Sequence, residues 1–276
     1  MKNTITHPYW HVDLKWLLAL LALPFLATVL LLTASYRLTA KEPAVDILSY
    51  TLAGLTSSEG IDSDFDIEQL RQDLDANEET VVAFGGVNVT ITAEDLDNLS
   101  PREIRLKIFS AFAERFYDVG AGGVAEDISS DTEAIVQIED DAVLISPLTS
   151  AGHRQIGVYL AIATVIALAL LSMAVLFSYR LGRLVTPGVL LLLAGLPGIL
   201  FMAIAASNPN TPSGTIRSET GEGSMELAGN FVSFMAPLIM PYLSSTYMSA
   251  FLLGVTLLVL ALMLKIILKH RDKENG

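Results

Sequence analysis

Four uninterrupted apolar blocks constrain this chain more than any other feature. Each block is 19 to 23 residues long and holds no Asp, Glu, Lys, Arg or His. A helix rises about 1.5 Å per residue, so each block is long enough to cross the ~30 Å hydrocarbon core of a bilayer. A backbone in lipid has to satisfy its own hydrogen bonds, which predicts a transmembrane helix for each block. The blocks are residues 16–35, 156–178, 184–206 and 246–264.

The composition agrees with a membrane protein and disfavours several other classes. Charged residues make up 17% of the 276 residues, against about 25% in soluble domains. The formal net charge of −13 repels the phosphates of nucleic acid, so no nucleic-acid partner is expected. Cysteine is absent, which removes disulfides, thiol nucleophiles and thiolate metal sites.

The first apolar block has two interpretations. Basic residues precede it, as they do in a signal peptide. Its apolar core is longer than the ~7–15 residues of a signal peptide, and Leu38 occupies a position where cleavage needs a small residue. We therefore favour an uncleaved anchor, with a cleaved signal peptide as the alternative.

The distribution of basic residues predicts how the chain crosses the membrane. Residues 1–15, 179–183 and 265–276 together hold eight basic and three acidic residues. Residues 36–155 hold 24 acidic and 8 basic residues, a net charge of −16. The positive-inside rule therefore places the N-terminus, 1–15, and the tail, 265–276, in the cytoplasm. It places residues 36–155 and the loop 207–245 outside the cell membrane.

Residues 36–155 are predicted to form a small acidic extracytoplasmic α+β domain. Two β-prone runs flank Gly85-Gly86, a pairing typical of a hairpin turn. Ser100, Pro101 and Glu103 form a capping box. They begin an amphipathic helix of about 17 residues that the glycines at 120, 122 and 123 end.

Other parts of this segment give weaker patterns. Residues 41–64 are polar and mixed, which indicates a partly ordered approach. A helix is expected from Asp66, and a second hairpin over 134–145, for which a helix is the alternative. Thr149 or Ser150 is expected to cap the helix of the second span.

The acidic residues carry only weak signals for chemistry. Asp62, Asp64 and Asp66 alternate as at the start of an EF-hand loop, but the sixth and twelfth positions hold Ile67 and Asp73 in place of Gly and Glu. No metal site is therefore expected, and a looser calcium site is the weak alternative.

Two further acidic clusters, Glu94-Asp95 with Asp97 and Glu139-Asp140-Asp141, consist of neighbouring residues in the chain. Such neighbours do not indicate two carboxylates held across a cleft. We therefore expect no catalytic residue and no bound cofactor.

The third span, 184–206, contains two Pro-Gly pairs, Pro187-Gly188 and Pro197-Gly198. Pro197 falls in mid-span, removes a backbone hydrogen bond and should kink the helix. These four residues are candidates for a hinge in a transport pathway. The alternative, which we favour, is a static kink that neighbouring helices approach closely through Gly195 and Gly198.

Residues 225–240 are mostly apolar, with Glu226 as their only charged residue, and Pro237 interrupts them. The pattern indicates an interfacial or re-entrant helix, because the segment is too short and interrupted for a further span. An apolar segment outside a span needs a partner. Candidates for docking are Met225, Phe231, Phe234 and Met235.

These observations favour a non-enzymatic structural, accessory or assembly subunit of an envelope complex that acts through its outer domain. The expected partners are the lipid bilayer and either another protein or further copies of the chain. A transport or channel component that uses the kinked third span is the alternative, although the uncharged spans lack the groups of a proton relay. An outer-face enzyme built on carboxylates is the second alternative.

Overall fold

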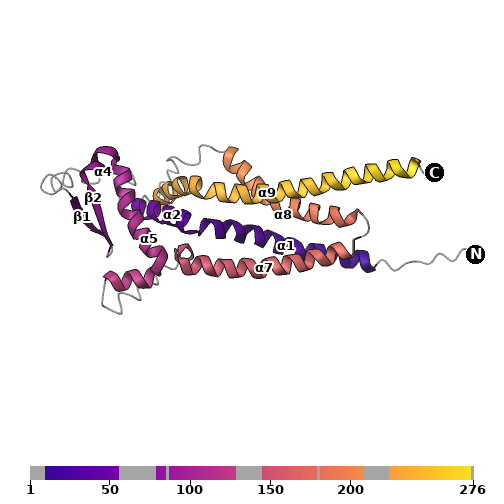
Figure 1. Cartoon of the computed structure of the whole chain (residues 1–276), viewed down its shortest axis with the longest axis horizontal. Coiled ribbons are helices and arrows are strands. Elements are labelled where there is room, and N and C mark those ends of the chain that lie inside the picture. Colours follow the sequence, from indigo (N-terminus) through magenta and orange to yellow (C-terminus); the bar gives the residue numbers. More distant parts are fainter. Residues whose placement is uncertain are drawn as a thin grey trace, which may run out of the picture. The chain divides into compact units, whose positions relative to one another are not determined.

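The structure is a computed structural model that describes residues 10–55, 79–84, 87–128, 145–178, 181–207 and 224–274. In this part of the chain, four helices are long and apolar enough to cross a membrane (Figure 1). They are Asp13–Leu38, Ser150–Leu176, Gly182–Ala203 and Ala236–His270. Each contains most or all of one predicted block. The predicted α-helical class, with four helices able to span a membrane, is confirmed, and these helices indicate a multi-pass membrane protein.

The chain divides into two compact units. The first unit comprises Met1–Ser35, Gly157–Asn208 and Met240–Gly276. The second unit comprises Tyr36–Ile156 and Pro209–Ile239. Each unit has its own core and is described separately below.

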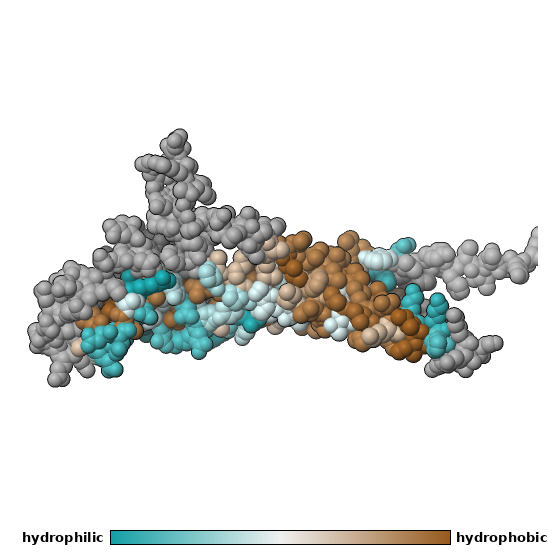
Figure 2. All heavy atoms as spheres, turned by 90° about the horizontal axis from the view of Figure 1, so that it is seen from above, coloured by the Kyte–Doolittle hydropathy of each residue, from teal (hydrophilic) through white to brown (hydrophobic). Residues whose placement is uncertain are grey.

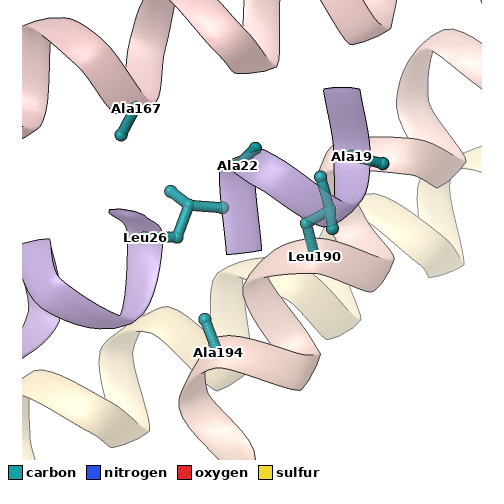
Figure 3. Packing of buried hydrophobic residues seen from close by; sticks show 6 residues of the cluster. All are labelled: Ala19, Ala22, Leu26, Ala167, Leu190 and Ala194. Atoms are coloured by element: carbon teal, nitrogen blue, oxygen red, sulfur yellow. The ribbon is translucent and has the colours of Figure 1, made fainter. Parts of the chain in front are cut away.

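The first unit is formed by parts of four helices, which are α1 (Trp10–Leu38), α7 (Ser150–Leu176), α8 (Gly182–Ser207) and α9 (Ser224–Glu274). Its buried cluster consists mostly of alanines (Figure 3), with Ala19 and Ala22 on α1, Ala167 on α7 and Ala194 on α8. Small side chains let helix backbones approach closely, which is how membrane helices pack. Larger apolar side chains such as Leu20 point outward. Figure 2 shows a broad hydrophobic surface on the face that it draws, suited to contact with lipid.

Helix α9 differs from the sequence expectation. A span over 246–264 and a separate interfacial or re-entrant segment were expected, whereas one helix of 51 residues runs from Ser224 to Glu274. Pro237 and Pro241 lie within it and do not end it. Proline is tolerated in membrane helices because hydroxyls and neighbouring helices can satisfy the freed backbone groups.

The predicted hairpin is confirmed in the second unit. Strands β1 (Glu79–Phe84) and β2 (Val87–Thr92) pair antiparallel, with Phe84 opposite Val87 across a two-residue loop. Val89 and Ile91 are buried and alternate with the exposed Asn88 and Thr90. In the described residues these are the only strands, so the broader α+β class stays a prediction.

The capping box at Ser100 is also confirmed. The Glu103 carboxylate accepts hydrogen bonds from the amide and the hydroxyl of Ser100 at 2.7 Å, and the Glu103 amide donates back to the hydroxyl at 3.3 Å. Helix α5 (Pro101–Ile128) starts here. It kinks at Gly120, whose φ of 74° is the left-handed conformation that glycine adopts most easily. The predicted helix end thus becomes a kink, beyond which a further helical stretch runs to Ile128.

The interpretation of residues 41–64 as a partly ordered approach was wrong for its first part. Residues Lys41–Leu55 form a helix, α2. Its buried residues Ala44, Ile47 and Leu48 follow the spacing of three and four that is typical of an amphipathic helix. Leu48 is 1% exposed and packs with Phe116 of α5. The helix from Asp66 and the hairpin over 134–145 lie outside the described residues.

Asp95 connects the short helix α4 (Ala93–Asn98) to α5. Its carboxylate accepts hydrogen bonds from the amide and hydroxyl of Thr92 at 2.9 Å and from the Lys107 ammonium at 2.7 Å. The Lys107 hydrogen bond, followed by that from the Thr92 amide, lowers the pKa of Asp95 to about 2.

This shift predicts a pH-dependent contribution of Asp95 to stability. A carboxyl whose pKa is lower in the folded state stabilises the fold above its unfolded pKa of about 3.9. The contribution is lost as the pH falls from about 4 to 2. We expect Asp95→Asn to lower the stability at pH 6 by about 1 kcal/mol, since it removes a partly exposed ion pair and half of a capping box.

The measurement is thermal unfolding of the purified chain in detergent, followed by circular dichroism at several pH values. The gap in melting temperature between the wild type and Asp95→Asn should narrow between pH 4 and pH 2. A gap of constant size over this range would show that the charge of Asp95 contributes nothing.

Candidate functional site

The second unit gathers polar side chains at the place where the chain enters it from α1 and leaves it through α7. We call this cluster the helix junction. No local sequence pattern brings its members together, because they come from four separate helices and from the connection between α1 and α2. The helix junction comprises Tyr36, Thr39, Lys41, Glu114, Tyr117, Asp118, Ser150 and His153.

His153 joins the first turns of α7 to the end of α1. Its ring stacks on that of Tyr36, with centroids 4.2 Å apart and planes 25° apart. Its Nδ1 lies 3.0 Å from the hydroxyl of Thr39. Thr39 is 3% exposed, so this contact is shielded from solvent. The expected cap of α7 lies beside it, where the Thr149 hydroxyl accepts a hydrogen bond from the Gly152 amide at 3.2 Å.

Tyr117 of α5 contacts the same short connection. Its phenolic hydroxyl donates to the carbonyl of Thr39 at 3.3 Å. Burial, together with the nearby charge of Asp118, raises the pKa of Tyr117. The phenol therefore keeps its proton and remains a donor at physiological pH.

Lys41, the first residue of α2, connects that helix to α5. Its ammonium lies 2.8 Å from the Glu114 carboxylate and 3.2 Å from that of Asp118. Hydrogen bonds to Glu114 and then to Asp118 raise the pKa of Lys41, which keeps it charged. Because all three side chains are about half exposed, these pairs contribute little stability each. They fix how α2 lies against α5. The hydroxyl of Ser150 similarly joins α7 to α5, because it donates to the Asp118 carbonyl at 3.3 Å.

The chemistry available at the helix junction is limited by burial. A hydroxyl beside an imidazole, as in Thr39 and His153, is the arrangement that a nucleophile and its general base require. The Thr39 hydroxyl is out of reach of a substrate, however, and it also lies 3.3 Å from the carbonyl of Tyr36. The pair therefore holds helices together, and this geometry favours a structural role for the cluster.

The predicted metal and carboxylate candidates do not assemble into a site in the part of the chain that the structure describes. Asp62, Asp64 and Asp66 lie outside the described residues. Among the described residues, no three His, Asp or Glu side chains are grouped to hold a metal ion. Asp95, from the cluster at 94–97, is bonded to Thr92 and Lys107.

The hinge candidates lie in α8, where the glycines contact α9. A Cβ built on Gly198 would clash with the ring of Tyr247. Gly188 and Gly254 face each other so closely that a Cβ on Gly254 would lie 2.8 Å from the Gly188 carbonyl oxygen. Pro187 and Pro197 lie inside the same helix. These contacts favour close packing as the role of the glycines, and the hinge stays a prediction.

The docking candidates Met225, Phe231, Phe234 and Met235 all fall on the first turns of α9. Their side chains lie outside the described part of the structure. Their role in docking therefore stays a prediction.

Comparisons with protein-family models, with curated proteins and with solved structures find no match to this chain.

The helix junction predicts the effect of removing the buried hydroxyl. In Thr39→Val, His153 loses its hydrogen-bond partner, and stability should fall by about 1–3 kcal/mol. Thr256→Val is the matched control, because its exposed hydroxyl bonds only the Leu252 carbonyl of its own helix. When thermal unfolding is measured in detergent, the melting temperature should be lower than that of the wild type for Thr39→Val alone. Equal shifts for both variants would contradict the role given to Thr39.

The close contact between α8 and α9 predicts that a single methyl group added at Gly254 lowers the stability of the protein. Gly254→Ala places a Cβ against backbone atoms of Gly188 and Leu192, which cannot move aside. Overpacking of this kind costs about 1–3 kcal/mol. Gly182→Ala is the control, since its Cβ would come no closer than 3.5 Å to any neighbour. A melting temperature unchanged in Gly254→Ala would contradict this packing.

Proposed function

We propose that this chain is a non-enzymatic accessory or assembly subunit of a complex in the cell envelope. In this proposal the second unit, extended by residues outside the described part into a small α+β domain, lies on the outer face of the cell membrane. Both termini lie in the cytoplasm. The basic residues of 1–15, 179–183 and 265–276 and the net charge of −16 on residues 36–155 support this orientation.

The helix junction is the observation that carries the proposal. Its polar groups contact one another. His153 and Tyr117 both bond to Thr39. Lys41 pairs with Glu114 and Asp118. Together they join α2 and α5 to the ends of two membrane-spanning helices. These contacts hold the helices of the second unit in one arrangement, which suits the presentation of a defined surface to a partner.

The charge of the second unit indicates the kind of partner. Glu94 and Asp97 are exposed on α4, and Glu114 and Asp118 are about half exposed on α5. The positive charge of Lys41 offsets part of the negative charge of Glu114 and Asp118. Residues 36–155 as a whole remain strongly acidic. Such a surface attracts a partner with a basic face and keeps anionic lipid at a distance.

The test is purification of the full chain in a native lipid particle, followed by mass spectrometry of the intact complex. We expect a second protein at fixed stoichiometry. Reversal of charge in Glu94→Lys with Asp97→Lys should reduce the recovered partner about tenfold, equivalent to ~1.4 kcal/mol. The neutral pair Glu94→Gln with Asp97→Asn should give a smaller loss, and thermal unfolding confirms that each variant folds.

Two results would contradict the proposal. One is recovery of the chain alone or only as copies of itself. The other is solute flux in liposomes that hold the purified chain and no other protein, which would favour a transport component.

A further inference from the structure

A groove runs between α1 and α8 within the first unit. Its volume is about 630 Å³, inside the range of about 300–1,000 Å³ found for ligand sites. Most of its lining is apolar, with Leu17, Leu20 and Leu23 from α1 and Val189 and Leu193 from α8. We call it the α1–α8 groove.

One end of the α1–α8 groove is polar. Asp13, Lys15 and Trp16, near the start of α1, line it together. The Lys15 ammonium lies 5.3 Å from the centre of the Trp16 ring. A Cβ on Gly182, the first residue of α8, would lie 3.8 Å from this ammonium. The charge of Lys15 therefore sits beside the start of a 26-residue helix, where the helix dipole is also positive.

Asp13 gives the same end of the groove a negative charge. Within the described residues, no ion pair joins the Asp13 carboxylate to the Lys15 ammonium. The mouth of the groove thus holds one cationic group, the Lys15 ammonium, which can bind an anion. It also holds one anionic group, the Asp13 carboxylate, which can bind a cation. Trp16 is 62% exposed beside them, as is typical of a tryptophan at the level of lipid headgroups.

Charge decides what occupies such a groove in a bilayer. An acyl chain gains little by leaving other lipid for an apolar groove, because the two environments are alike. The apolar lining therefore sets the shape of the occupant, and the polar mouth sets its identity. We propose that the α1–α8 groove binds a phospholipid whose headgroup carries both a phosphate and a primary ammonium, as in phosphatidylethanolamine. The phosphate pairs with Lys15, and the ammonium donates hydrogen bonds to the Asp13 carboxylate.

Two common headgroups fit this mouth less well. Phosphatidylcholine has the same charges, but its quaternary ammonium has no N–H to donate to Asp13. Phosphatidylglycerol has no cation, so the Asp13 carboxylate would repel its headgroup. The α1–α8 groove should therefore select phosphatidylethanolamine over both.

The first experiment measures retained lipid. The full chain in detergent is equilibrated with equal amounts of the three lipids, all with the same acyl chains, and native mass spectrometry counts the bound molecules. Phosphatidylethanolamine should exceed phosphatidylcholine about tenfold, which corresponds to one charge-assisted hydrogen bond. Asp13→Asn should bring this ratio close to one and raise retention of phosphatidylglycerol. Asp97→Asn, in the second unit, should leave both unchanged.

A second pair of variants tests the groove itself. Leu20→Trp fills the groove from a residue that is 69% exposed, so the fold should tolerate it. Leu252→Trp is the matched control, because Leu252 is 55% exposed on α9 and does not line the groove. Retained phosphatidylethanolamine should fall at least tenfold in Leu20→Trp alone.

Three outcomes would overturn the proposal. The first is a wild type that prefers phosphatidylglycerol. The second is a lipid ratio unchanged in Asp13→Asn together with phosphatidylethanolamine retention unchanged in Leu20→Trp. The third is cross-links from Leu20→Cys that show a second protein chain in the groove.

Discussion

The rest of the structure depends on one constraint, the need of a backbone in lipid to satisfy its own hydrogen bonds. That need makes each apolar block a helix, and it leaves the helices without a hydrophobic force to bring them together. Contact then has to come from small residues. Alanines fill the cluster around Ala22 and Ala194, and Gly188 and Gly254 meet so closely that a methyl group has no room.

The second unit is instead held together by burial of large apolar side chains. Burial of Leu48 and Phe116 and of Ile91 and Ile104 forms its apolar clusters, as expected for a segment that folds in water. Polar contacts then act where the chain enters and leaves the unit. His153 and Thr39 are 114 residues apart in sequence and 3.0 Å apart in space. The proposed function and the proposed lipid site use different units, so either can fail without the other.

Local patterns predicted the features that depend on neighbouring residues. The spans, the hairpin at Gly85-Gly86 and the capping box at Ser100 each follow from hydrogen bonds or hydrophobic spacing within a few residues. Helix α2 has the same spacing of three and four between its apolar residues, but the polar residues at its start hid this pattern. The helix junction and the α1–α8 groove depend on which helices pack together, and a single sequence contains no local signal for that. The length of α9 was missed because Pro237 was taken to interrupt residues 225–240, whereas the helix continues through it.

The proposed orientation, with the second unit outside the cell and the end of α9 inside, can be tested by cysteine labelling because the chain has no cysteine of its own. Asp97→Cys and Lys269→Cys each add one thiol at an exposed position. The measurement is labelling of intact cells with a maleimide that cannot cross membranes. We expect labelling of Asp97→Cys in intact cells and of Lys269→Cys only after permeabilisation. The reverse pattern would contradict it.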